Sequence, residues 1–323
     1  MTSSALAEIE IFSPFDGSKV GAVPAASVAD VAQAIGVAHA QLDVPMPAHE
    51  RAAVLERASE LLAERREAIA HTIMREAGKP ITAARGEVDR AVDTLRFCAV
   101  EARSLGSTTI PMDASASGAG KIAFMQLYPR GVVGAITPFN FPLNLCCHKI
   151  GPAVAAGCPI VHKPASQTAL TAVALREVMI DAGLPPDRYQ LVCGEGHDVG
   201  EAITGDDRVE MITFTGSSEV GWKIRERCAK KHVSLELGNC APLIVFEDAD
   251  LEDVAAKVAM HGYSFAGQSC ISIQRVLVHR SVYNEAVEQI AAKVSTLGVG
   301  DPALESTHAV SYTHLTLPTI LLV

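Results

Sequence analysis

Three residues combine a reactive side chain with a position next to a turn. Cys270 ends the segment GQSC, and a cysteine that follows a glycine-rich turn can be an activated thiolate. Glu236 lies in LELG at the end of a predicted strand, where a carboxylate can act as a general base. Asn140 lies in TPFNFP, between two aromatic residues and two prolines. Such a stiff turn fixes the amide, whose NH₂ group can donate a hydrogen bond to an oxyanion.

Each of these residues also has a simpler explanation. Asparagine commonly forms turns, and free cysteine is usually a small buried hydrophobic residue. The chain has eight cysteines, so the packing explanation applies to any one of them by default. Cys146 and Cys147 fit it, because they lie within an apolar segment that is predicted to be a helix.

Three further segments are typical of nucleotide sites. Lys163 follows a predicted strand, and ligands bind at the carboxyl ends of strands in open α/β sheets. FTGS (214–217) ends a strand at a helix N-terminus, where free N–H groups and the helix dipole favour phosphate. GEGHDVG (194–200) has one residue too many for the Rossmann glycine pattern. Each segment also has a simpler explanation: Lys163 can be a solvated lysine at a strand end, and the glycines can belong to ordinary turns between strand and helix.

The elements that must position these residues change in type along the chain. The first third is predicted to be helical, with a capping box formed by Ser27 and Asp30. The expected helices span residues 28–42, 47–77, 81–105 and 168–182. After an extended excursion over 106–120, the expected strands span residues 121–128, 132–137, 159–162, 190–193, 210–214 and 233–237. Strands that alternate with helices predict a parallel sheet of the dinucleotide-binding type.

A second unit of the same kind begins near Pro242. It is predicted from a strand over 243–246, a helix from Leu251, a strand over 275–278 and a helix from Val282. The predicted fold class is therefore α/β, with one Rossmann-like domain followed by part of another α/β domain.

Composition and charge narrow the function. Of the 323 residues, 49% are hydrophobic and 20% are charged, which is enough for a sizeable core. The net charge of -10, without a long basic run, argues against a nucleic-acid partner. No CxxC pair occurs, so the usual zinc and redox spacings are missing and no metal site is predicted. The N-terminal segment lacks a signal-peptide pattern and no apolar run suits a membrane, so we expect a cytoplasmic protein.

In this order, TPFNFP, KPA, FTGS, LELG and GQSC resemble the motifs of the aldehyde dehydrogenase superfamily, and the likeness covers residues 8–310. The resemblance implies a Rossmann-like NAD(P)-binding domain over 1–241, which includes a small extended oligomerisation segment at 106–129. Residues 242–310 would form the first part of an α/β catalytic domain. The full-length parent would be a homodimer or a homotetramer.

The resemblance also implies a reaction. Cys270 would add to an aldehyde carbonyl to give a thiohemiacetal, whose oxyanion is held by the Asn140 amide and the Cys270 N–H. Hydride transfer to NAD or NADP would leave a thioester, and Glu236 would activate the water that hydrolyses it. This glutamate favours a hydrolytic enzyme over the coenzyme-A-acylating branch. The residues implied to bind the cofactor are Thr137, Phe139, Lys163, Ser166, Gly196, Gly216, Ser217, Val220 and Leu237.

Two departures from the family pattern lie close to this site. Ser166 stands where many NAD-preferring relatives have Glu, so there is room for a 2'-phosphate near Lys163 and we expect NADP to be accepted. Asn239 and Cys240 are unusual in ELGNCAP. Cys240 is expected to be a buried packing residue, and a second thiol near the site is the alternative.

The third departure is at the end of the chain. Members of the superfamily continue well past residue 310, whereas residues 311–323 resemble a translated vector junction, with an apolar C-terminal strand as the alternative. We therefore expect a fragment that leaves apolar faces and strand edges uncovered, and that is inactive alone.

Two other functions explain fewer of these residues. A cofactor-binding relative without catalysis has no need of Asn140, Glu236 and Cys270 together. A generic nucleotide-binding module explains Gly216 and Ser217 but not the Cys and Glu. Within the superfamily, FAGQSCISIQRVLVHRSVY resembles the lactaldehyde dehydrogenase-like branch, which includes enzymes for phosphonate-type aldehydes. A small aldehyde in a modest pocket is the expected substrate.

Overall fold

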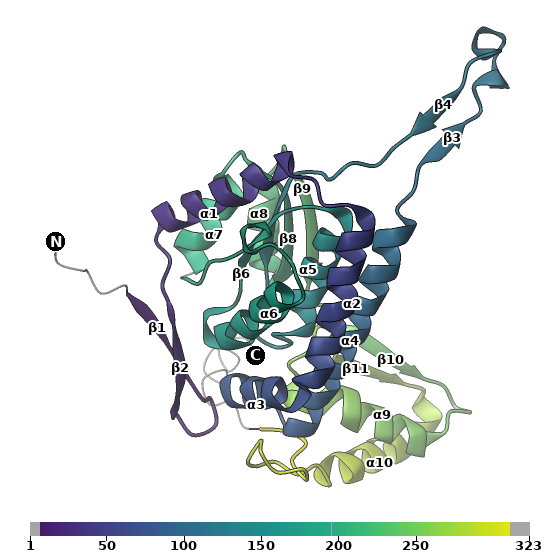
Figure 1. The fold of residues 1–323 in the computed structure, drawn as a ribbon. Coiled ribbons are helices and arrows are strands. Elements are labelled where there is room, and N and C mark those ends of the chain that lie inside the picture. Colours follow the sequence, from purple (N-terminus) through teal and green to yellow (C-terminus); the bar gives the residue numbers. More distant parts are fainter. Residues whose placement is uncertain (1–6, 195, 311–323) are drawn as a thin grey trace.

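The computed structural model describes residues 7–194 and 196–310, and its centre is a five-stranded parallel sheet (Figure 1). The strands are Val132–Ile136 (β5), Ile160–Lys163 (β6), Tyr189–Leu191 (β7), Val209–Gly216 (β8) and His232–Leu237 (β9). Their order is β7-β6-β5-β8-β9, so the chain moves outward from β5 and then returns to its other side. This is a doubly wound, Rossmann-like sheet, which confirms the predicted fold class.

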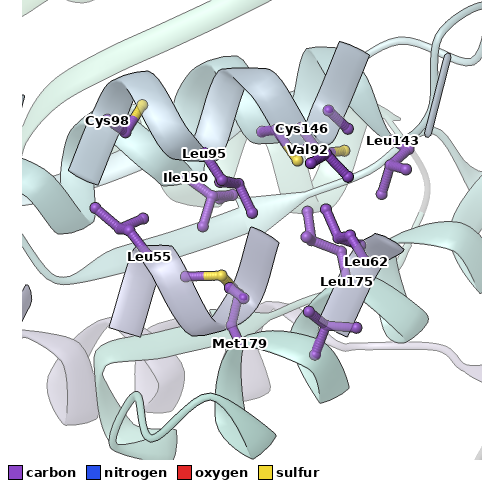
Figure 2. Close-up of a cluster of buried hydrophobic side chains, with 14 of the residues drawn as sticks. Leu55, Leu62, Val92, Leu95, Cys98, Leu143, Cys146, Ile150, Leu175 and Met179 are labelled. Carbon is purple, nitrogen blue, oxygen red and sulfur yellow. The ribbon is translucent and has the colours of Figure 1, made fainter. Parts of the chain in front are cut away.

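One face of the sheet packs against five helices. Val133 and Ala135 of β5 point into this core, which forms because side chains alternate between the faces of a strand. The helices are Ala48–Glu64 (α2), Arg66–Ala77 (α3), Ile81–Ser104 (α4), Asn144–Ala156 (α5) and Ala169–Asp181 (α6). Figure 2 shows where Leu55, Leu95 and Ile150 meet between them.

The opposite face packs against three other helices. These are Val28–Ala40 (α1), Gly196–Gly205 (α7) and Ser218–Arg227 (α8). Ser27 begins α1 with the predicted capping box: its hydroxyl accepts the Asp30 N–H, while the Asp30 carboxylate accepts the Ser27 N–H at 2.8 Å. On β5, a Cβ at Gly134 would lie 2.6 Å from the Ile203 side chain, so only glycine lets α7 come this close.

Two antiparallel hairpins leave this body. Glu8–Phe12 (β1) pairs with Lys19–Pro24 (β2), and Thr108–Ile110 (β3) pairs with Ala123–Met125 (β4). The β3–β4 hairpin projects far from the sheet (Figure 1). Its apolar side chains are uncovered in the single chain, and Ile122 is 93% exposed.

A smaller α/β unit follows β9. Ala241–Val245 (β10) and Ile273–Val278 (β11) pair in parallel, with Leu251–Tyr263 (α9) between them and Tyr283–Ser295 (α10) after them. One face of this sheet packs on α9 and α10. On the other face Ile244 and Leu277, which are partners in the register, are both exposed. An uncovered apolar face at this unit is what the sequence predicts, while the domain boundary at residue 241 stays a prediction.

Most of the expected elements are confirmed, and their ends shift by a few residues. The prediction that the first third is helical is wrong for β1 and β2. The alternation of Glu8, Ile9, Glu10 and Ile11 is the signal for this hairpin, since Ile11 is buried in its core while Glu8 is exposed. The helix expected over 47–77 is divided between α2 and α3 at Arg65.

Two further expectations concern residues 121–128 and 311–323. The strand expected over 121–128 is confined to Ala123–Met125. The prediction for residues 311–323 lies outside the described part of the chain. Among the described helices, none combines the length and the apolar character that a membrane crossing requires.

A buried chain of hydrogen bonds links three elements of the core. His162 of β6 bonds through Nε2 with the Thr137 hydroxyl at 2.9 Å and through Nδ1 with the Tyr189 hydroxyl at 2.8 Å. The Cys146 thiol of α5 also reaches Thr137 Oγ1, at 3.3 Å. Burial lowers the pKa of His162 to about 3, and the positive charge of Lys149 adds to this effect. His162 is therefore neutral at pH 7.

We predict that His162 makes the protein less stable as the pH falls below 6.5. The unfolded chain takes up a proton near the ordinary histidine pKa and the folded chain does not until about pH 3. In this window the free energy of unfolding falls by about 1.4 kcal/mol per pH unit from this residue alone. Urea denaturation should show that His162→Gln loses about 2 kcal/mol less than wild type between pH 6.5 and pH 5.

The matched control is His71→Gln, which changes an exposed histidine of α3. This variant should keep the wild-type dependence on pH. Equal pH dependence in the His162 variant and in wild type would show that the buried imidazole takes up its proton in the folded state.

Candidate active site

The carboxyl edge of the sheet gathers most of the predicted cofactor residues. Ile136 of β5 pairs with Lys163 of β6 and with Phe214 of β8, and Gly216 pairs with Leu237 of β9. These strands therefore end side by side. After β5 the chain adds β6 and β7 on one side of β5, and it then adds β8 and β9 on the other side. The boundary between β5 and β8 is therefore the switch point, where open α/β sheets bind ligands.

A hollow of about 600 Å³ lies at this edge. Three predicted cofactor residues, Lys163, Gly196 and Val220, line it. Two further lining residues, Lys223 and Arg227, were missed by the sequence analysis. The sequence spacing could have indicated them, because they follow Val220 by about one and two turns of α8 and so lie on the same face of the helix.

The start of α8 is built from Gly216 and Ser217. A Cβ at Gly216 would lie 2.6 Å from the Phe214 ring, so glycine is required where β8 ends. Ser217 is the N-cap, and its hydroxyl accepts the Val220 N–H at 3.4 Å. Leu237 packs over the same turn, since a Cβ at Gly221 would lie 2.5 Å from its side chain.

Ser166 and Phe139 lie on a separate hollow of about 430 Å³, beside β1. The Ser166 hydroxyl donates to the Gly194 carbonyl at 3.0 Å. The Lys163 ammonium is buried and donates to the Pro164 carbonyl at 3.2 Å. Thr137 differs from the other cofactor candidates, because its hydroxyl points into the core and bonds His162.

Asn140 is in contact with the segment that contains Cys270. Its Nδ2 donates to the Gln268 carbonyl at 3.1 Å, and its Oδ1 accepts the Phe141 N–H at 3.1 Å. Both ends of the amide are therefore oriented. The Nδ2 contact joins segments that are 128 residues apart in the chain, so a distant segment fixes the amide together with its own turn.

The turn before Cys270 has an unusual backbone. Phe265 (φ 52°, ψ 40°) and Ala266 (φ 53°, ψ 30°) both adopt left-handed conformations, and Gly267 follows with φ 73°. Left-handed backbone is strained for residues with a Cβ, and it clusters at functional sites. The turn ends α9 and leaves Cys270 half-buried.

Asn239 ties the end of β9 to this turn. Its Nδ2 donates to the Cys270 carbonyl. Glu236 lies on the same stretch of chain, exposed near the end of β9. The segments of Asn140, Glu236 and Cys270 are thus held together by two side-chain hydrogen bonds to backbone carbonyls.

The electrostatics of the site centre on Lys149 of α5. Burial lowers the pKa of Lys149 to about 8, and the electrostatic interaction with the Glu236 carboxylate acts against this shift. Its ammonium donates to the Thr213 hydroxyl at 3.1 Å. Lys149 is therefore a buried amine whose charge depends in part on Glu236.

A model of the aldehyde dehydrogenase family matches residues 1–314. The chain belongs to the aldehyde dehydrogenase family. The resemblance inferred from the five motifs is thereby confirmed. The chain spans about 63% of the length of the curated relatives that it matches.

Relatives of this aldehyde dehydrogenase chain are named for several aldehydes. It is 40% identical over 300 residues to a 3-sulfolactaldehyde dehydrogenase of Priestia megaterium, covering 93% of this chain and 63% of the relative. It is 35% identical over 306 residues to the lactaldehyde dehydrogenase of Methanocaldococcus jannaschii, covering 93% and 65%. An NADP-dependent glyceraldehyde-3-phosphate dehydrogenase from Bacillus halodurans, solved with NADP, superposes with a TM-score of 0.92 at 38% identity, covering 95% of this chain and 65% of the other.

The cysteines of this family member differ in exposure: six are buried, Cys270 is half-buried and Cys240 is exposed. Cys98, Cys146, Cys147, Cys158, Cys193 and Cys228 are buried. Burial raises the pKa of Cys146 to about 12 and that of Cys98 to about 11, so these groups remain thiols. The prediction that Cys240 is a buried packing residue is wrong, because the structure exposes it. Within residues 7–194 and 196–310, no cluster of His, Cys, Asp and Glu could hold a metal ion.

Proposed function

We propose that this protein oxidises an aldehyde to a carboxylic acid, with NAD or NADP, through a thioester on Cys270. The observation that carries the proposal is the hydrogen bond from the Asn140 amide to the Gln268 carbonyl at 3.1 Å. It brings an oxyanion donor to the turn that presents the half-buried thiol.

The chemistry divides among the three residues. The Cys270 thiolate adds to the carbonyl carbon, and the negative charge moves to the oxygen, where the Asn140 amide and the Cys270 N–H stabilise it. Bound NAD(P) supplies the hydride acceptor, and loss of hydride from the carbon leaves a thioester. Water then attacks the thioester while Glu236 takes its proton, which releases the acid and restores the thiolate.

The exposed position of Glu236 suits this second step. Its carboxylate can meet water at the end of β9, and the connection after β9 is bonded to Cys270 through Asn239. Lys149 lies close enough for the charges of the two groups to interact. A carboxylate here supports hydrolysis of the thioester rather than its transfer to coenzyme A.

The cofactor would lie along the carboxyl edge of the sheet. The hollow of about 600 Å³ and the start of α8 fit a dinucleotide, because helix N-termini and cations attract phosphate. Since the Thr137 hydroxyl is turned inward, its backbone would face the cofactor. We keep as proposed contacts Thr137, Phe139, Lys163, Ser166, Gly196, Gly216, Ser217, Val220 and Leu237.

For the substrate, we propose a short aldehyde that carries an anionic group. The relatives at 37–40% identity include enzymes named for 3-sulfolactaldehyde, glutarate semialdehyde and succinate semialdehyde. Each of these names denotes a small aldehyde with a sulfonate or a carboxylate. Turnover of succinate semialdehyde no better than that of the neutral aldehyde of equal length would contradict this substrate class.

The nucleophile and the base can be tested separately in an enzyme of the relatives' length that contains this sequence. We predict that Cys270→Ala lowers turnover at least about a thousandfold, since no thioester can form. Glu236→Gln should keep one rapid release of reduced cofactor per site and slow later turnovers about 100-fold or more, because only hydrolysis loses its base. Absorbance at the reduced-cofactor band, followed by stopped flow, measures both.

Cys240→Ala is the matched control, because it removes an exposed thiol. It should change turnover by less than about twofold. A Cys270→Ala enzyme that still turns over would reject the thioester mechanism. A folded wild-type protein that binds cofactor and turns over no aldehyde would favour the non-catalytic relative.

Ser166 allows a direct test of cofactor choice. We predict that wild type uses NADP and that Ser166→Glu shifts the NAD over NADP ratio of kcat/KM toward NAD by about tenfold or more, because the carboxylate repels the 2'-phosphate. Gln167→Glu adds the same charge to the neighbouring residue, which lines the same hollow. A shift of equal size in that control would assign the effect to net charge instead of position.

We also propose that a second copy of this chain covers the β3–β4 hairpin. The hairpin projects from the body and exposes Ile122 and Phe124, which favours burial against a partner. Changing both residues to Asp should shift sedimentation of the enzyme toward the monomer. Lys121→Asp, at the same hairpin, removes no apolar area and should leave the assembly unchanged.

A further inference from the structure

Lys79 is a buried cation beneath the two loops that carry Asn140 and Cys270. It lies between α3 and α4, and it is 1% exposed. Its ammonium donates to the carboxylate of Glu87 on α4, which is also buried. A buried ion pair costs desolvation that an apolar pair of similar volume would avoid, so packing alone does not explain it.

The ammonium also lies over two aromatic rings. It is 3.7 Å from the ring centroid of Phe141 and 4.6 Å from that of Phe265. Phe141 directly follows Asn140 in the chain, and Phe265 lies in the turn that leads to Cys270. A cation over an aromatic face is attracted by the ring, and the attraction is stronger away from water. One charge therefore holds a ring from each loop.

Glu87 fixes the far end of the Asn140 loop. Its Oε1 accepts the Leu143 N–H at 2.8 Å and the Asn144 N–H at 3.1 Å, at the start of α5. The N-cap residue of α5, Leu143, has no side-chain capping hydrogen bond, so Glu87 supplies the acceptor. The partner of Lys79 thus anchors the same loop through its backbone.

The strained turn needs such an anchor. Phe265 is left-handed and 3% exposed, and its ring is the one that faces Lys79. Its carbonyl accepts the Gln268 N–H at 3.0 Å, and the Gln268 carbonyl accepts the Asn140 amide. Lys79, Phe141, Asn140, Gln268 and Phe265 therefore form a closed ring of contacts.

We infer that Lys79 is a positioning residue, which sets the Asn140 amide against the Cys270 turn by binding Phe141 and Phe265. The inference rests on the proposed function, because it assigns Lys79 to the step in which the oxyanion forms. Without the charge, the two loops lose the contact with Lys79 that they share.

The test is the double variant Lys79→Met/Glu87→Gln in the enzyme of the relatives' length. It removes the charge over the rings without leaving a carboxylate unpaired, and the amide oxygen introduced at position 87 can still accept the N–H groups of α5. We expect kcat to fall about 10- to 100-fold, as for a misplaced catalytic group, with KM for the cofactor changed by less than about twofold. Adding Phe265→Leu should then cost little more, because the ring has already lost its cation.

Arg188→Met is the matched control for stability. Arg188 is another buried cation, bonded to the carbonyls of Gln41 and Gly157, and Gly157 lies at the opposite end of α5. A fall in kcat no larger than in this control would overturn the inference. Folding is checked in each variant with iodoacetamide, since the six buried cysteines must stay unreactive.

If the Lys79 double variant does not fold, Phe141→Leu and Phe265→Leu carry the test, because both keep the ion pair. We expect each to lower kcat with an unchanged KM for the cofactor, and wild-type kcat in both would overturn the inference. The proposed function fails separately: its test is loss of turnover in Cys270→Ala, whatever the Lys79 variants do.

Discussion

The site depends on one constraint, which is that all strands of a parallel sheet end at the same edge. Strands β5, β6, β8 and β9 each carry a candidate residue at or just beyond their carboxyl ends, and the strand register places them side by side. The candidate nucleophile is the exception. Cys270 comes from the next unit of the chain, so its placement depends on contacts that reach back to the first sheet.

Buried carboxyl groups, as well as apolar packing, join the helices that surround this sheet. Glu76 of α3 accepts the N–H groups of Leu170 and Thr171 at the start of α6, as Glu87 of α4 does for α5. Burial raises the pKa of Glu76 to about 8, although its hydrogen bonds with Thr171 lower it. Helices of the first third thus cap helices that cover the parallel sheet, which joins the two regions at the level of the backbone.

The sequence is informative where the signal is local. The Ser27 capping box, the strand ends near Lys163 and Gly216, and the turn at Asn140 follow from neighbouring residues. The contacts of Lys79 and Asn239 do not, because each depends on a partner that only the fold brings near. Cys240 shows the same limit: free cysteine is usually buried, but the structure exposes this one.

The capping of α5 by Glu87 also bears on how the molecule opens. The amides of Leu143 and Asn144 have their hydrogen-bond acceptor on α4, so they exchange with solvent only when α4 undocks or α5 frays. A subglobal opening that separates α4 from α5 would free the Asn140 loop at the same moment. Protection of these two amides therefore reports whether the Asn140 loop is held in place, in the absence of any ligand.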